Sequence, residues 1–248
     1  MKPIWFSLLS LLCVGCVSIP NESIHTALSS HVLSQYELFN GVVVHDDLVV
    51  QTDITATFPG GFQLGVWYSA GLNDDSFSSD FGDEVDYTVG WNGKVGQTSV
   101  SAGVSYFDIL ELGHRTKGVV DVLRPYIVAS QSYEVAENHT LGPVAKLEGK
   151  LRVEGHADAG VTLWLGIQHA WKLNPRLDFN QKLRVIGDTG SIGFHDIILG
   201  RYDAGFAYRL GKNVAWNVLS FTATTPFTSA ADGQETSTTY GTGLTIKF

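Results

Sequence analysis

The sequence predicts an all-β fold, a transmembrane antiparallel meander β-barrel of about twelve strands after a cleaved signal peptide. Three observations lead to this prediction. The N-terminus is typical of a secretory signal, the apolar residues of the remaining chain alternate with polar ones, and the last strand ends on an aromatic residue. No stretch after the signal approaches the roughly 20 apolar residues that a membrane-spanning helix needs.

The N-terminal segment MKPIWFSLLSLLCVGCVSIP combines Lys2, an apolar run and small residues, so we assign residues 1–18 to a signal peptide. Cleavage after Gly15 satisfies the small-residue rule. The same bond also resembles a lipoprotein signal, in which Cys16 becomes the acylated first residue, and the sequence leaves both kinds of processing open. Cys13 lies in the same segment, so no disulfide framework is predicted.

Residues 19–33 are expected to form a short periplasmic N-terminal segment before the barrel, which we place at 34–248. Asn21 can cap a helical turn in this segment. The apolar residues that share one side of such a turn are Ile24, Leu28 and Val32.

The barrel strands are predicted from alternation of apolar and polar residues between turn signals. An even number of strands places both chain ends on the same side of the membrane, as in bacterial barrels. The predicted strands run approximately over 35–44, 48–58, 62–72, 84–92, 97–109, 122–133, 140–152, 161–173, 177–187, 197–210, 214–226 and 237–248.

The connections between these strands alternate in length. Those after even-numbered strands are short, as in PGG at 59–61 and GKN at 211–213. Those after odd-numbered strands are mostly longer and polar, as in NDDSFSSDFGD at 73–83, and the first hairpin, through HDD at 45–47, is the exception. Short periplasmic turns and long outer loops are typical of outer-membrane barrels.

Aromatic residues mark the inner ends of the even-numbered strands. The last outward residue of each such strand is predicted to lie at the inner membrane interface, where aromatic side chains concentrate. These residues are Phe58, Trp91, Tyr133, Trp171, Tyr208 and Phe248. The alternative is a soluble sandwich or a lipocalin-like barrel, for which the opposite strand faces are too polar to form a second apolar layer.

The C-terminal strand, YGTGLTIKF, has one apolar face and one small or polar face. It resembles the signal that the assembly machinery of outer-membrane barrels recognises, so this machinery is a predicted partner. The residues of the predicted assembly signal are Tyr240, Leu244, Ile246 and Phe248.

Alternation also identifies the side chains that face the lumen. The strand at 140–152 is the clearest case, because its charged residues share one face and its apolar residues share the other. A Lys or Arg that faces lipid near the bilayer midplane costs about 2–4 kcal/mol, so these side chains must face water or one another. The predicted lumen-lining residues are Gln51, Asp53, Trp67, Glu84, Asp86, Lys146, Glu148, Lys150, Arg152, Lys182, Arg184, Arg201 and Asp203.

The charges of the predicted lumen are unevenly distributed. Basic residues gather on the strands between 122 and 210, whereas the strands at 48–58 and 84–92 are acidic. We expect these two arcs to face each other across a water-filled pore that favours polar or charged solutes. The alternative is a salt-bridge network that closes a narrow lumen, although twelve strands enclose more room than the eight that side chains just fill.

Other chemistry finds little support in the sequence. The net charge of −9 argues against nucleic-acid binding, and we predict no catalytic residue, no cofactor and no metal site. His169 points outward beside Trp171, which favours an interface residue over the general base of a hydrolase. The candidates for a rim metal site lie in Asp-rich predicted outer loops, which are ordinarily solvated: His45, His156, His195, Asp74, Asp75, Asp80 and Asp83.

One block of the chain resembles a known family. It comprises VVQTDITATFPGGFQLGVWYSAGLNDD, FGDEVDYTVGWNG and VSAGVSYFDIL, within residues 49–110. These segments resemble a proteobacterial family of uncharacterised, porin-like outer-membrane β-barrels, which shows an early Val-Gln-Thr/Pro strand, a Gly-x-Trp-x-Ser/Tyr strand and a Glu-x-Asp-Tyr strand. The resemblance implies a barrel and brings no catalytic residues. It makes one lumen arc the better candidate for solute contact: Gln51, Asp53, Trp67, Glu84 and Asp86.

We therefore expect a monomeric barrel in the outer membrane of a Gram-negative bacterium that lets small hydrophilic solutes diffuse passively through a charged lumen. The expected partners are outer-membrane lipid and lipopolysaccharide, the barrel-assembly machinery and small polar solutes. One alternative is a closed structural or adhesive barrel whose outer loops bind a surface partner. Another, an interface enzyme acting on lipid, is not favoured by any residue pattern.

Overall fold

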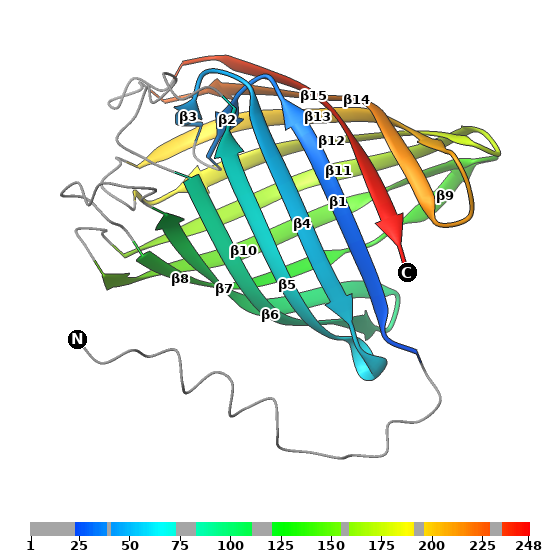
Figure 1. The fold of residues 1–248 in the computed structure, drawn as a ribbon, viewed down its shortest axis with the longest axis horizontal. Helices are drawn as coiled ribbons and strands as arrows, with labels where there is room; N and C mark the ends of the chain where they lie inside the picture. The colour runs from blue at the N-terminus through cyan, green and yellow to red at the C-terminus, as the bar shows by residue number, and fades with distance from the viewer. Residues whose placement is uncertain are drawn as a thin grey trace.

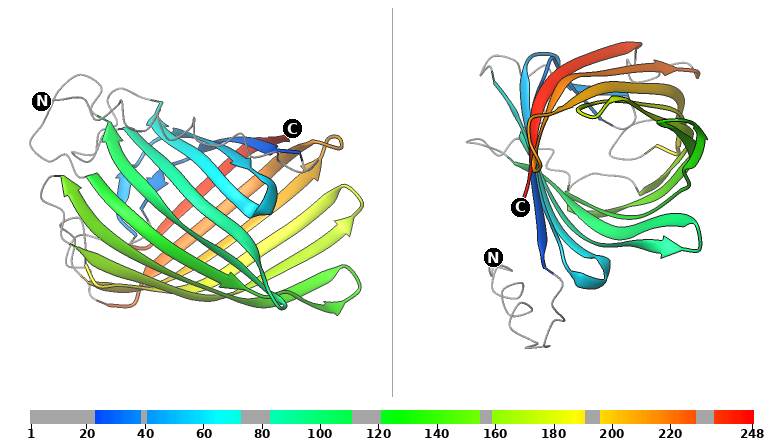
Figure 2. Two further views of the ribbon diagram at one scale, coloured as in Figure 1. Left: turned by 90° about the horizontal axis from the view of Figure 1, so that it is seen from below. Right: turned by 90° about the vertical axis from the view of Figure 1, so that its right-hand side faces the viewer.

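The computed structural model describes residues 23–38, 41–72, 83–110, 121–154, 159–190, 196–228 and 235–248. The predicted signal peptide, residues 1–18, lies outside these ranges. Twelve long strands form one closed antiparallel β-barrel, which appears as a ring in the right-hand view of Figure 2. The predicted fold class is confirmed. Among the described residues, no helix is long and apolar enough to cross a membrane.

The wall strands follow one another around the barrel in chain order (Figure 1). The last strand pairs with the first, with Leu28 opposite Ile246, and this pairing closes the ladder. A closed ladder has no free edge, which is what a β-structure in lipid requires. The wall strands are β1 (His25–Leu33), β4 (Val49–Thr57), β5 (Phe62–Gly71), β6 (Asp83–Val95), β7 (Thr98–Leu110), β8 (Asp121–Ser130), β10 (His139–Glu154), β11 (Gly160–Asn174), β12 (Leu177–Asp188), β13 (Ile197–Arg209), β14 (Val214–Pro226) and β15 (Ser237–Lys247).

Three short strands complete the fold. β9 (Tyr133–Ala136) pairs with the start of β10 and lengthens that hairpin beyond the wall. β2 (Tyr36–Glu37) and β3 (Val43–His45) pair with each other and form a separate two-stranded hairpin between β1 and β4.

The start of the barrel differs from the prediction. β1 lies within residues 19–33, which we expected to be a periplasmic segment, and residues 35–44 belong to the β2–β3 hairpin instead of the wall. The apolar spacing of four residues misled the prediction, because residues four apart share one side of a strand as well as of a helix. In β1 that side faces outward, with Val32 40 % exposed.

The two ends of the barrel carry different connections. We call the end with the tight turns at 58–61, 96–97, 137–138, 175–176 and 210–213 the short-turn end, and the opposite end the long-loop end. The tight turns lie at the right of Figure 1, and β2 and β3 lie at the left, at the long-loop end. The predicted alternation of connection lengths is therefore found in the structure.

Glycine is required in the first tight turn, a 3-10 turn at Pro59–Gly61. Gly61 has φ of +88°, and a Cβ built on it would overlap the backbone carbonyl oxygen of Asn92. Trp91 lies over the same turn and donates a hydrogen bond from Nε1 to the carbonyl oxygen of Gly60, at 2.8 Å. The turn is thus tied to the neighbouring hairpin.

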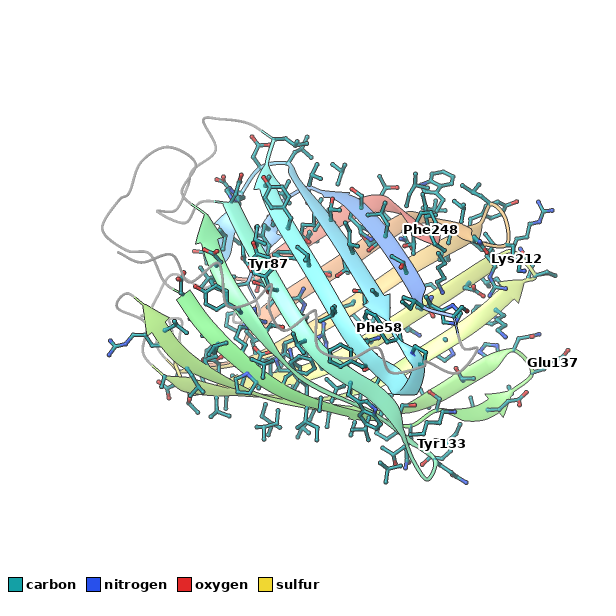
Figure 3. All side chains as sticks on the ribbon, turned by 60° about the horizontal axis from the view of Figure 1, so that its bottom comes forward. Phe58, Tyr87, Tyr133, Glu137, Lys212 and Phe248 are labelled. Atoms are coloured by element: carbon teal, nitrogen blue, oxygen red, sulfur yellow. The ribbon has the colours of Figure 1, made fainter. Side chains whose placement is uncertain are left out.

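The outer face of the wall is an apolar belt. Leu147, Leu165, Ile167 and Leu183 are each about half exposed on it, between 49 % and 59 %. Of the predicted aromatic residues at the short-turn end, Phe58 and Tyr208 are half-buried, and the others are 38–69 % exposed: Trp91, Tyr133, Trp171 and Phe248. Figure 3 shows Phe58, Tyr133 and Phe248 nearer than Tyr87 to the turn residues Glu137 and Lys212.

Candidate functional site, the barrel lumen

Charged side chains on the inner face of the wall form two ion-pair clusters. In the first, Arg124 of β8 lies between two carboxylates, 3.2 Å from Asp86 on β6 and 3.2 Å from Glu148 on β10. Lys146 pairs with the same Glu148. The predicted acidic and basic arcs therefore meet side by side at Arg124. Our expectation that they face each other across the lumen is wrong at this point.

The second cluster lies on β10 to β13. Lys150 pairs with Asp188, both side chains are 0 % exposed, and the Thr162 hydroxyl donates to the same carboxylate at 2.6 Å. Arg184 and Arg201 both pair with Asp203.

The remaining predicted lumen residues occupy the acidic arc and the rim. Gln51 donates to the Ser69 hydroxyl at 3.3 Å, and Asp53 accepts from Thr55 at 3.0 Å. Arg152 is exposed near the long-loop rim.

Positive charge predominates in the middle of the lumen. Lys182 has no carboxylate within ion-pair distance among the residues that the structure describes. Lys146 and Arg184 lie over the two-ring system of Trp164, 4.4 Å and 4.7 Å from the ring centroid. A cavity of about 370 Å³ is lined by these groups and their neighbours: Thr88, Ser105, Arg124, Tyr126, Val128, Val144, Lys146, Glu148, Trp164, Lys182 and Arg184. We call it the cationic cavity.

A second cavity, of about 480 Å³, lies toward the short-turn end. Amide and hydroxyl groups such as Gln168, Asn180 and Ser132 line it, together with Asp203. Lys182 lines both cavities, so they are neighbours along the barrel. Polar, hydrogen-bonding side chains of this kind suit a passage for hydrated solutes.

The β2–β3 hairpin packs inside the long-loop half of the lumen, although we predicted residues 35–44 to be a strand of the wall. Leu38 and Val44 of the hairpin pack in one cluster with Phe107 of β7 and Val122 of β8. The dipeptide Asn40-Gly41 between two apolar runs is a strong hairpin signal that could have revealed this element. Gly41 adopts φ of +84°.

Tyr36 fastens the hairpin to the acidic arc. Its hydroxyl donates to Glu84 at 2.6 Å, and its ring lies 5.7 Å from that of Trp67. Burial and the neighbouring Glu84 carboxylate raise the pKa of the Tyr36 hydroxyl well above its usual range, so the hydroxyl keeps its proton and remains a donor. Glu84 itself is only 4 % exposed, which removes it from solute contact in this conformation.

A second apolar cluster lies on the inner face at the same end. Ile186, Ile197 and Leu199 are at most 3 % exposed, and Trp164 packs against them. These residues separate the cationic cavity from the long-loop rim. The long-loop half of the lumen is thus packed like a protein core.

The other candidate chemistry finds no assembled site. His45 is buried in the hairpin, Asp83 accepts from the Tyr68 hydroxyl at 3.0 Å, and the other rim candidates, His156, His195, Asp74, Asp75 and Asp80, lie outside the described residues. Among the described residues, no three His, Cys, Asp or Glu side chains are grouped to hold a metal ion.

The outward histidine belongs to a polar row on the membrane face. His169 lies 3.2 Å from His139 and 2.9 Å from Gln181, and the Tyr202 hydroxyl donates to Gln181 at 2.7 Å. His139 also stacks on Trp171, with ring centroids 4.8 Å apart. These side chains hydrogen-bond to one another at the level of the aromatic residues of the wall, as residues at a membrane interface do.

Solved structures with the same architecture are porins. A KdgM porin matches with a TM-score of 0.57 and 12 % identity over 90 % of this chain and 99 % of that one. A NanC porin matches with a TM-score of 0.56 and 11 % identity over 89 % of this chain and 100 % of that one. A KdgM porin in complex with disordered oligogalacturonate gives a TM-score of 0.54 and 12 % identity, over 90 % and 99 % of the two chains.

No family model matches the chain, and no curated protein matches it. The structural likeness, at this identity, is a likeness of fold. Together with the closed ladder and the apolar outer belt, it makes this chain a porin-like β-barrel of the Gram-negative outer membrane. The predicted location is therefore confirmed.

Proposed function

We propose that this protein is an outer-membrane channel through which small hydrophilic solutes diffuse passively, and that it prefers anions. The cationic cavity carries this proposal. Lys182 is free of a carboxylate partner among the described residues, and Lys146, Arg124 and Arg184 line the same space. Like charges placed along a pore raise the local concentration of the opposite ion.

Two further observations support an anionic solute. Trp164 and Tyr126 line the cationic cavity, and Lys146 lies 4.4 Å from the Trp164 ring centroid and 5.6 Å from that of Tyr126, so cations and aromatic rings stand together there. One of the similar porins binds oligogalacturonate, whose sugar units carry carboxylates. A carboxylate on a saccharide suits an Arg or Lys for its charge and an aromatic ring for its apolar sugar face.

The test is single-channel conductance of the refolded barrel in a planar bilayer under a salt gradient. Lys182→Glu should shift the reversal potential toward cation preference, because it replaces the unpaired cation of the cavity by an anion. Lys212→Glu, the same change in an exposed short turn, is the matched control and should leave selectivity close to that of the native barrel. Open channels with equal selectivity in all three proteins would contradict the proposed cavity.

A closed structural or adhesive barrel is the second candidate function. The core-like packing of the long-loop half favours it. A correctly folded barrel that never conducts, even without the hairpin, would support this candidate over the channel. Recognition of the C-terminal strand by the barrel-assembly machinery, contact with lipopolysaccharide, and removal of a signal peptide stay predictions.

A further inference from the structure

The β2–β3 hairpin is inserted between two stretches of chain that backbone hydrogen bonds tie to the wall. Backbone hydrogen bonds fasten the chain on either side of it, from Ser34 to Tyr240 and between Leu72 and Leu48. Within the hairpin, Leu38 N–H donates to Val42 and Gly41 N–H donates back to Leu38. The hairpin is thus an inserted element between two fixed points.

Side chains of the hairpin contact the wall inside the lumen. Tyr36 donates to Glu84, and Leu38 and Val44 pack on the apolar residues of β7 and β8. Such contacts can break while the ladder of the wall remains intact. A second state, with the hairpin outside the lumen, would leave the ladder of the wall unchanged.

Glu37 adds an ion pair and a hydrogen bond to the inserted state of the hairpin. Its side chain is 2 % exposed, it accepts a hydrogen bond from Ser237, and its Oε1 lies 3.7 Å from an Arg201 nitrogen. Arg201 also donates to Asp203, at 3.3 Å. The hairpin thus brings its own carboxylate to a cation on β13 that lies opposite Arg184, a residue of the cationic cavity.

We propose that the β2–β3 hairpin is a displaceable plug. In the inserted state, its Glu37 carboxylate pairs with Arg201 at the place where an anionic solute would otherwise bind. This proposal depends on the channel function proposed above. A carboxylate or other anion that reaches Arg201 competes with Glu37, which weakens one anchor of the inserted state. The apolar cluster and Tyr36 keep that state dominant when no anion is present, because displacement exposes Leu38 and Val44 to water.

The first test locks the plug in place. We would introduce Val44→Cys and Val122→Cys, which join hairpin and wall in one apolar cluster, in a Cys16→Ser background. Cross-linking is verified by mass, with a short bis-maleimide if a disulfide does not form. The cross-linked barrel should lose at least about tenfold of its mean conductance relative to its uncross-linked form, since the lock removes the open state from the ensemble. Equal conductance with and without the verified cross-link overturns the plug.

The second test weakens the charge anchor. Glu37→Gln should raise the open probability several-fold and abolish its increase on addition of galacturonate, because the internal carboxylate is gone. Asp46→Asn, the same loss of charge at an exposed position beside the hairpin, is the matched control and should behave like the native barrel. If Glu37→Gln has the same open probability as the native barrel and the Asp46→Asn control, the proposed role of Glu37 is overturned.

A hairpin deletion separates the plug from the channel. We would replace residues 36–45 by a short Gly-Ser linker and confirm folding by heat-modifiable migration. If the folded native and deletion barrels are both silent, the channel function itself fails. If the native barrel conducts, and neither deletion nor cross-linking changes its conductance, the plug fails while the channel function stands.

Discussion

The long-loop half and the short-turn half of this lumen are built from the same strands but have opposite interiors. In the long-loop half, the inward residues Phe107, Ile186 and Leu199 are at most 1 % exposed. In the short-turn half, Gln168 and Asn180 line a cavity of about 480 Å³. The inward wall residues of the two halves differ, and in the long-loop half the β2–β3 hairpin packs against them. Apolar wall residues and one inserted hairpin together give half of the lumen a core-like packing.

The largest expected effect is on the buried ion pair of the long-loop half. Lys150→Ala should lower the free energy of unfolding by about 3–5 kcal/mol, because it leaves the Asp188 carboxylate buried without its cation. Urea unfolding of the refolded barrel in detergent or lipid measures this. The control is Arg209→Ala, which breaks the ion pair with Asp178 at the short-turn end, where Arg209 is 48 % exposed. That change should cost about 0–1 kcal/mol. If Lys150→Ala and Arg209→Ala lose equal unfolding free energy, the difference between the two halves is contradicted.

The second largest loss of stability is expected in the apolar cluster of the long-loop half. Leu199→Ala should cost about 2–5 kcal/mol, because Leu199 is 0 % exposed and its loss leaves a cavity against Ile186 and Trp164. Leu183→Ala, on the membrane face of β12 with 59 % exposure, is the matched control. Its expected cost in the same unfolding experiment is about 1 kcal/mol or less, since lipid fills the space it leaves. A control that loses as much as Leu199→Ala would argue against a core in the lumen.

The smallest expected effect concerns the first tight turn of the short-turn end. Gly61→Ala combines a left-handed backbone with overlap on the Asn92 carbonyl and should cost about 2–4 kcal/mol or shift the turn. Gly60→Ala shares the positive φ but has open space around its Cβ, so about 1–2 kcal/mol is expected. Parallel unfolding curves of the two variants measure the difference. Equal stability would mean that the turn relaxes freely.

Much of the wall follows from local pattern. From β4 to β15 the predicted strands differ from the observed ones by a few residues, because alternation is a property of neighbouring residues. Lys146, Glu148 and Lys150 face the lumen because the only other direction is lipid. The start of the barrel was predicted wrongly, because the apolar spacing of Ile24, Leu28 and Val32 suits one side of a helical turn as well as one side of a strand. Local pattern therefore did not show that residues 25–33, and not 35–44, join the wall.

The lumen is less predictable than the wall. Charge alternation predicted that Lys182, Arg184 and Asp203 face inward, but it did not predict that Arg124 joins the acidic and basic arcs. The buried Lys150–Asp188 pair comes from β10 and β12, two strands apart in the sheet. Which inward side chains form ion pairs depends on the curvature of the barrel, and no period in the sequence encodes the distance between side chains on different strands.

By itself the sequence determined that this chain forms a closed membrane barrel with a charged inner face and an apolar outer one. The physical reason is local: a period of two assigns each side chain to lipid or lumen, and lipid excludes charge. Only the tertiary structure decided which part of the lumen holds cavities and which part is packed like a core. That outcome depends on where the β2–β3 hairpin lies, and its apolar residues gain burial only once twelve strands have closed around them.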